Sequence, residues 1–90
     1  MEAAEIIDKL KKASGCFELY HTTTFKGYGN DEKGNVREVT ITILDAGVPS
    51  ATRYHVYAQD EKGRAATGNS NGSLDAAIAI THWGDLNRDR

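Results

Sequence analysis

The three histidines, His21, His55 and His82, are the first candidates for chemistry, because imidazole binds metals and transfers protons near neutral pH. A zinc site needs about four nitrogen, sulfur or oxygen ligands at tetrahedral reach. The chain has no CxxC, HxxxH or HExxH spacing. Strand alternation also predicts that His21 and His55 point to opposite faces of a sheet. We therefore expect no metal site.

Nucleophilic catalysis would fall to Cys16, the only cysteine, or to a serine, and either needs a neighbouring base. Cys16 lies at the start of a predicted strand, two residues from Glu18, and this placement favours a small, half-buried thiol. Acidic residues cluster at two predicted turns, Asp31-Glu32 and Asp60-Glu61, which is the usual solvated placement. We expect no catalytic residue and no cofactor, so the sequence predicts a protein that is not an enzyme.

The composition fits one small globular domain of 90 residues with a net charge of −2. A slightly acidic chain lacks the basic field that phosphate contacts require, so the charge disfavours nucleic acid as a partner. A single cysteine indicates a reducing compartment. No run suits a signal peptide or a membrane span. We expect a cytoplasmic protein with no membrane partner, whose domain covers residues 1–86 and whose residues 87–90 form a frayed polar tail.

Two amphipathic helices are predicted, one near each end of the chain. Residues 2–14 place apolar side chains at three- and four-residue spacing, with acids early and lysines late, and Gly15 should end this helix. Ser73 is a good N-cap for the second helix, which Gly84 should end. Its alanines would let the helix backbone lie close to a sheet.

Four strands are predicted between the helices, at residues 16–25, 36–45, 53–59 and about 64–68. The glycine-rich residues 26–35 are predicted to form a long, mobile hairpin loop, without the spacing of a phosphate-binding loop. The resulting order is α-β-β-β-β-α. We expect an α+β fold in which an antiparallel meander sheet has both helices packed on one face.

This arrangement divides the strand residues into a core face and an open face. The predicted core comprises Ile6, Ile7, Leu10, Phe17, Leu19, Val39, Ile41, Ile43, Tyr54, Val56, Leu74, Ile78 and Trp83. The predicted open face carries Glu18, Tyr20, Thr22, Thr24, Thr40, Thr42, Leu44, His55, Tyr57 and Gln59. Such a face is a solvated sheet surface, a contact for a protein, or a platform on which unpaired bases stack.

Two local patterns resemble known families. The α-β-β-β-α outline, with Gly-Asn-Ser before the last helix, is similar to a double-stranded-RNA-binding domain. That family carries lysines at the start of its last helix, where this chain has Ser73, Leu74 and Asp75. This resemblance therefore implies a related fold without binding of double-stranded RNA.

The second pattern covers residues 63–84: GRAATG, a polar break, an alanine-rich helix, then Trp83-Gly84. It is similar to small phage and mobile-element proteins, among them some anti-CRISPR inhibitors, and to the sheet-to-helix junction of HicB-type antitoxins. The resemblance implies a small, acidic, non-enzymatic protein that occupies a surface on a larger machine.

These observations predict a protein-interaction domain, of the phage-encoded inhibitor type, that acts by steric occupancy of a larger protein or nucleoprotein machine. The candidate anchors on the open face and the 26–35 loop are Tyr20, Tyr28, His55 and Tyr57. The candidate phosphate mimics at the turns are Asp31, Glu32, Asp60 and Glu61. The alternative is a nucleic-acid-binding domain that uses the aromatic and threonine side chains of the open face. A homodimer through the open sheet or an edge strand is a further partner class.

Overall fold

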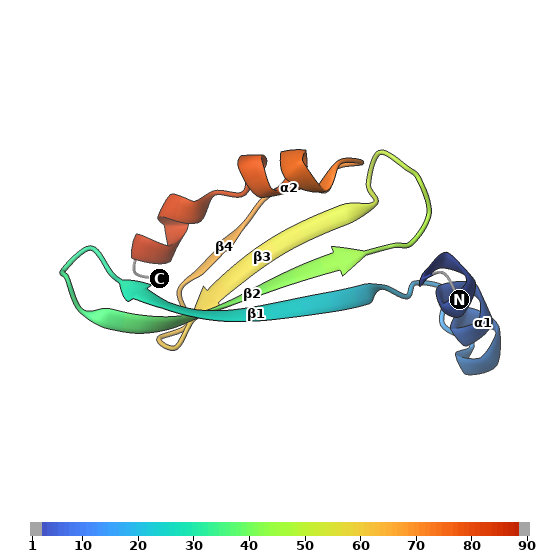
Figure 1. Cartoon of the computed structure of the whole chain (residues 1–90), viewed down its shortest axis with the longest axis horizontal. Coiled ribbons are helices and arrows are strands. Elements are labelled where there is room, and N and C mark those ends of the chain that lie inside the picture. The colour runs from blue at the N-terminus through green and yellow to red at the C-terminus, as the bar shows by residue number, and fades with distance from the viewer. Residues whose placement is uncertain (1–2, 89–90) are drawn as a thin grey trace.

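The chain folds around one antiparallel sheet, and the structure, a computed structural model, describes residues 3–88. The elements in chain order are α1 (Ala3–Ser14), β1 (His21–Asn30), β2 (Val36–Asp45), β3 (Tyr54–Asp60), β4 (Ala65–Thr67), α2 (Leu74–Ile80) and the 3-10 helix η1 (Trp83–Asn87). The sheet has four strands in the order β1-β2-β3-β4 (Figure 1). The predicted α+β fold with a meander sheet is confirmed. Residue 2 of the predicted first helix lies outside the described residues.

One face of the sheet, here called the inner face, is covered by α2 and η1, which contact β3 and β4 (Figure 1). The opposite face is called the outer face. Ala58, Ala66 and Leu86 form the buried centre of the inner layer, and Trp83 packs against it. The approach is close because the residues are small: a Cβ added at Gly68 would lie 2.8 Å from the Ile80 carbonyl oxygen.

The alternation predicted for β2 and β3 is confirmed by the strand register. Ile43 lies opposite Val56 and Ile41 opposite Ala58, so their side chains share the inner face. Val56 is 2% exposed. The prediction that Phe17 is a core residue of the first strand is wrong. Phe17 is 90% exposed, because β1 begins only at His21.

The second helix is shorter than predicted. Ser73 caps its start by accepting a hydrogen bond from the Ala76 amide, as expected, but α2 ends at Ile80 rather than near Gly84. Thr81 has an extended backbone, and the His82 amide then donates to the Thr67 carbonyl oxygen at 3.0 Å. This bond to the end of β4 turns the chain out of the helix and into η1.

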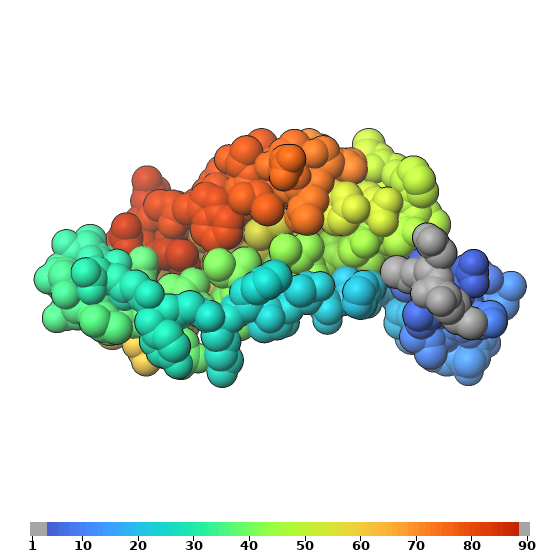
Figure 2. Space-filling model, in the orientation of Figure 1, coloured from blue at the N-terminus to red at the C-terminus, as the bar shows by residue number. Residues whose placement is uncertain are grey.

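The packing of α1 differs from the prediction that both helices cover one face. Figures 1 and 2 show α1 as a separate lobe beyond the end of the sheet. Ile7, at 5% exposure, faces the β2–β3 loop, where a Cβ added at Gly47 would lie 2.6 Å from its Cδ1. Ile6 and Leu10 are 43% and 49% exposed. Periodicity identified the helix, but its attachment point depends on a loop contact.

The molecule is elongated as a result of this placement. Its principal extents are 47 × 23 × 23 Å, and its radius of gyration is 15.2 Å. A compact domain of 90 residues is expected to have a radius of gyration of about 12 Å. A chain of this size therefore leaves more surface uncovered than usual.

The predicted long loop at residues 26–35 is mostly strand. β1 continues to Asn30, with Gly27 opposite Val39 and Gly29 opposite Arg37. The glycines are tolerated because β1 is an edge strand with open space beside them. Only residues 31–35 form a turn, closed by the Asp31 amide donating to the Asn35 carbonyl oxygen at 2.8 Å.

Candidate functional site

The outer face is built by alternate residues of three paired strands. In β1 and β2, Thr22 lies opposite Leu44, Thr24 opposite Thr42, Lys26 opposite Thr40 and Tyr28 opposite Glu38. In β3, His55, Tyr57 and Gln59 lie opposite Leu44, Thr42 and Thr40. The predicted open face is therefore present over these strands. Tyr28, assigned from sequence to a mobile loop, is a strand residue on this same face.

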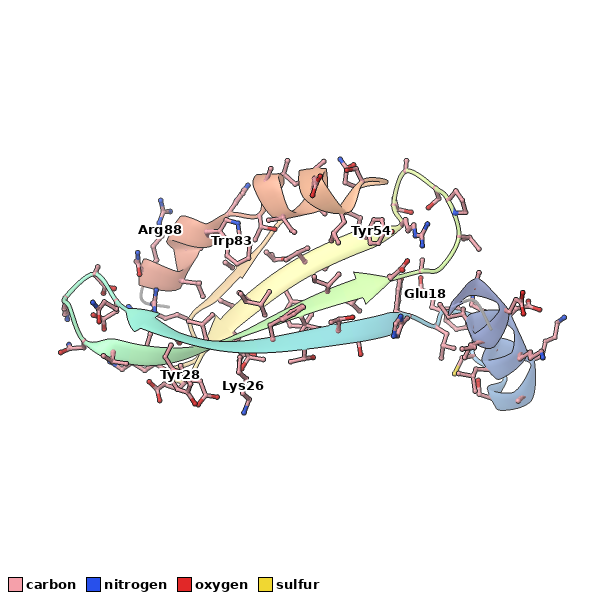
Figure 3. All side chains as sticks on the ribbon, viewed as in Figure 1. Glu18, Lys26, Tyr28, Tyr54, Trp83 and Arg88 are labelled. Atoms are coloured by element: carbon pink, nitrogen blue, oxygen red, sulfur yellow. The ribbon has the colours of Figure 1, made fainter. Side chains whose placement is uncertain are left out.

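Three exposed tyrosines lie on or beside the outer face, together with Val36, which pairs with Asn30 on the same face. Tyr28 is 73% exposed and Tyr57 is 38% exposed, while Tyr20, just before β1, is 42% exposed. Figure 3 shows Tyr28 and Lys26 pointing away from α2, whereas Trp83 lies on the α2 side of the sheet. Rings fixed on paired strands lose little conformational freedom when a partner covers them.

His55 is held in place on the outer face by two neighbouring hydroxyl groups. Its Nε2 atom lies 3.0 Å from Thr67 Oγ1, and its Nδ1 atom lies 3.4 Å from Ser70 Oγ. The ring centroid is 6.4 Å from that of Tyr57. A depression of about 280 Å³ borders His55, Leu44 and Tyr20. The predicted anchors Tyr20 and His55 thus meet at one end of the outer face, and Tyr57 lies next to His55 at the middle of β3.

Charged groups of both signs lie on or beside the outer face. Lys26 Nζ lies 3.3 Å from Glu38 Oε1, across the β1–β2 pair. The Glu38 amide donates to Glu61 Oε1 at 3.3 Å, which places Glu61 beside the same strand. The outer face therefore carries one ion pair and a further carboxylate rather than a basic field.

The two acidic turns lie at the end of the sheet remote from α1, and Arg64 joins them. Its Nε donates to Asp60 Oδ2 at 2.9 Å, its Nη1 donates to Glu32 Oε1 at 2.9 Å, and its Nη2 lies 3.8 Å from Asp31 Oδ2. Asp31 and Asp60 are only 8% and 5% exposed. Three of the four predicted phosphate mimics, Asp31, Glu32 and Asp60, therefore face an arginine of their own chain.

Each turn aspartate also closes its own hairpin. Asp31 Oδ1 accepts from the Lys33 and Asn35 amides, and Asp60 Oδ1 accepts from the Lys62 and Arg64 amides. The sequence Asp-Glu-Lys-Gly occurs at both turns, and its glycine has φ of 82° or 85°. The two turns therefore have the same hydrogen bonds, and the meander order places both at the same end of the sheet.

Arg37 connects this end of the sheet to the C-terminal segment. Its Nη1 donates to the Leu86 carbonyl oxygen at 2.6 Å and lies 3.5 Å from Asp60 Oδ2. Its Nη2 donates to Asn87 Oδ1 at 2.9 Å. We call Asp31, Glu32, Arg37, Asp60 and Arg64 the turn-end network. Asn87, predicted to begin the frayed tail, is the last residue of η1, while residues 89–90 lie outside the described residues.

The turn-end network favours ionised carboxylates. Amide hydrogen bonds, first that of Asn35, hold the pKa of Asp31 below its ordinary value despite burial. Burial alone would raise the pKa of Asp60, but hydrogen bonds from the Arg64 side chain and from the Arg64 and Lys62 amides outweigh it, so this pKa is also lowered. The Asp60 carboxylate in turn raises the pKa of Arg64. The network is therefore charged at neutral pH.

Arg53, at the other end of β3, is similarly engaged. Its Nε donates to Asp45 Oδ1 at 2.8 Å, and its guanidinium lies 4.8 Å from the centroid of the Tyr54 ring. This bond is the main reason that the pKa of Asp45 is lowered. Arg37, Arg53 and Arg64 therefore all face carboxylates of their own chain.

The histidines and Cys16, the candidates for metal binding and catalysis, do not come together in one site. His21 pairs with Asp45 on the inner side and His55 with Leu44 on the outer side, as parity predicted. Within residues 3–88, no group of three or more histidine, cysteine or acidic side chains is placed to hold a metal ion. Cys16 is exposed rather than half-buried, because it lies in the segment between α1 and β1. Neither helix in this range has the length and apolar character that a membrane crossing requires.

Arg37 and Arg64 were not singled out from the sequence, although Arg37 carried a signal. Arg37 has the same strand parity as Val39 and Ile41, so the sequence indicated a charged side chain on the core side of β2. A buried arginine needs a carboxylate partner.

No family model, curated protein or solved structure matches this chain.

Proposed function

We propose that this protein is a non-enzymatic, cytoplasmic interaction domain that binds a folded protein through its outer face. The observation that carries the proposal is the set of exposed tyrosines, led by Tyr28 at 73% exposure, on a sheet face opposite α2 and η1. Tyrosine is enriched in binding hot spots because it combines a large apolar ring with a polar hydroxyl group.

The charges of the outer face favour a protein over a nucleic acid. Nucleic-acid affinity depends on cations that neutralise phosphates. On this face Lys26 pairs with Glu38, and Arg37 is bound at the inner side of β2. A surface with mixed charge and tyrosine rings matches the polar and aromatic character of protein interfaces.

The specific mode that we propose is steric inhibition of a larger protein or nucleoprotein machine, as in the anti-CRISPR type that residues 63–84 resemble. These residues form β4, α2 and the start of η1, which lie on or beside the inner face. These residues pack on the inner side of the sheet and leave the outer face uncovered. Occupancy of this kind requires contact area and rigidity rather than a catalytic group.

The proposal is tested with the double variant Tyr28→Ser/Tyr57→Ser. Tagged wild-type and variant proteins are used to capture partners from nuclease-treated lysate of the native host, followed by mass spectrometry and affinity measurement with the captured protein. Loss of two hot-spot rings should weaken binding by about 30-fold or more. Ile80→Ser is the matched control, because Ile80 is 39% exposed on α2, away from the outer face.

Circular dichroism and thermal unfolding verify that the double variant is folded. Unchanged affinity in a folded double variant would remove the outer face as the binding site. Loss of every partner on nuclease treatment, with affinity that falls steeply between about 50 and 200 mM salt, would instead indicate nucleic-acid binding.

A further inference from the structure

The α1 helix exposes an apolar stripe that its own chain leaves uncovered. Ile6 and Leu10 are 43% and 49% exposed, and Phe17, in the segment that follows the helix, is 90% exposed. A groove of about 290 Å³ separates this stripe from residues 19–22. Within the described residues, the most buried side chain of α1 is Ile7, beside the β2–β3 loop.

The inner face of the sheet has a complementary uncovered region. Phe25 lies opposite Ile41 on this face and is 54% exposed, and Thr23 lies opposite Ile43. Ile41 and Ile43 are only half-buried. Since α2 and η1 pack over β3 and β4, the inner side of β1 has no helix above it (Figure 1). An amphipathic helix is the element that normally covers such a surface.

We propose that a second copy of this chain supplies that helix, so that two chains exchange α1. The α1 of each chain packs its Ile6 and Leu10 stripe on the inner face of the other chain's sheet, over Phe25 and Ile41. One chain carries both complementary surfaces, a helix stripe and an uncovered sheet region. A two-fold arrangement therefore buries both surfaces twice in a closed assembly.

The exposed area is close to what a stable dimer needs. With about 200 Å² for a large apolar side chain, the exposed parts of Ile6, Leu10, Phe17 and Phe25 amount to roughly 500 Å² per chain. Two copies would bury about 1,000 Å² from these side chains alone, against about 1,200 Å² for the smaller specific interfaces. The half-buried isoleucines and neighbouring polar atoms would supply the remainder.

The connecting segment allows the exchange. Gly15 has φ of 77° with open space around it, and it ends α1 through a hydrogen bond to the Lys11 carbonyl oxygen. Residues 15–20 can extend over roughly 20 Å, which lets α1 swing without unpairing β1. A terminal helix of each chain that packs on the other chain is one route to a symmetric dimer, and it would replace the contact of Ile7 with the β2–β3 loop. Phe17 lies in the hinge, where the partner would cover it.

The test is the molar mass of the full chain by light scattering after gel filtration, at high-micromolar concentration. The expected mass is twice the 9.8 kDa of one chain. Leu10→Asp and Phe25→Asp should each give the monomer mass, since each places a carboxylate in the helix–sheet contact. Val36→Asp is the matched control, because Val36 is 72% exposed on β2, away from both surfaces, and this variant should stay dimeric.

Mixing the two monomeric variants makes the test specific for exchange. A Leu10→Asp chain retains an intact sheet and a Phe25→Asp chain retains an intact helix, so the mixture should form a heterodimer through one intact contact, weaker than the wild-type dimer and populated at the highest concentrations. Native mass spectrometry detects this species by the different masses of the two variants. Circular dichroism verifies that each variant is folded, and Leu10→Ser with Phe25→Ser replaces any variant that is not.

A wild-type mass of 9.8 kDa at these concentrations would overturn the proposal, as would a dimer that both aspartate variants leave intact. A Leu10→Asp homodimer as abundant as the mixed species would show that the dimer uses another surface. None of these outcomes depends on the outer face, so the proposed function is tested separately.

Discussion

The two ends of the sheet differ in how their side chains are paired: charged groups are paired within the chain at one end, and apolar groups stay exposed at the other. At the turn end, Arg64 and Arg37 bring two hairpins and the C-terminal segment together, and their charges are paired within one chain. At the other end, α1 contributes Ile7 to a loop contact and leaves Leu10 and the neighbouring Phe17 exposed. A buried charge without a partner is costly in the folded chain, whereas exposed apolar surface can be covered later by another molecule.

The largest expected effect of a single substitution is at Asp60, whose side chain is fully buried between Arg64 and Arg37. Asp60→Ala leaves two arginines without this carboxylate and removes the cap of its turn. We expect the free energy of unfolding to fall by roughly 3 kcal/mol, as for other broken buried pairs. Chemical denaturation measures this change.

Asp8→Ala is the control for Asp60→Ala, because Asp8 pairs with Lys12 on the exposed surface of α1 at 3.0 Å. Exposed pairs of this kind contribute about 0.5 kcal/mol or less. Equal losses of stability in the two variants would contradict the contrast between the ends of the sheet.

Arg37→Ala tests the connection between the turn end and the C-terminal segment. It removes hydrogen bonds to the Leu86 carbonyl oxygen and to Asn87 Oδ1, and we expect a loss of roughly 2 kcal/mol in the free energy of unfolding. Amide hydrogen exchange in η1 should become faster. Arg88→Ala, which alters an exposed pair with Asp85, should leave this exchange rate unchanged. Slow exchange of η1 in the Arg37 variant would show that Leu86 alone holds the segment.

The covered and uncovered parts of the inner face are compared with two glycine substitutions. Gly68→Ala forces a Cβ to within 2.8 Å of the Ile80 carbonyl oxygen and should reduce the free energy of unfolding by roughly 1–2 kcal/mol. Gly29→Ala meets no atom within 4 Å and should change it by about 0.5 kcal/mol or less. Thermal unfolding of both variants gives the difference. A similar loss in both would show that Gly29, like Gly68, is closely packed.

The dependence of stability on pH should follow the same buried carboxylates. The folded-state pKa values of Asp31, Asp60 and Asp45 lie below the ordinary 3.8, so these carboxylates contribute stability that is complete above pH 3.8. The contribution is lost as the pH falls through the lower folded-state values. Denaturation between pH 7 and pH 2 should show this loss, and Asp31→Asn should reduce its slope. Stability that rises on acidification would contradict the assigned directions.

The sequence predicted the sheet well because alternation is a local property. Val39, Ile41 and Ile43 specify one face of β2 wherever its partners lie, and the opposite face followed from them. It predicted β1 poorly because Gly27 and Gly29 are typical of loops, although an edge strand accommodates them. The position of α1 could not be predicted, since a helical stripe shows that a contact is needed but not which surface provides it.

Part of the candidate site could also be predicted from strand alternation. Tyr57 and His55 follow from strand alternation, and Tyr28 joins them only once β1 is extended to Asn30. The acids Asp31 and Asp60 were interpreted as solvated, because their burial depends on Arg64, which reaches both turns. Contacts between segments distant in sequence, which no local pattern encodes, decided these cases.

Hydrogen exchange of the wild-type protein at two concentrations tests the contrast between the two ends most directly. We predict that the Asn35 and Arg64 amides, both bonded to turn aspartates, are protected equally at low and high concentration. Protection of α1 and of the segment around Phe25 should rise with concentration, as a second copy covers them. Protection of α1 that is the same at both concentrations, or turn amides that exchange as fast as α1, would contradict the account.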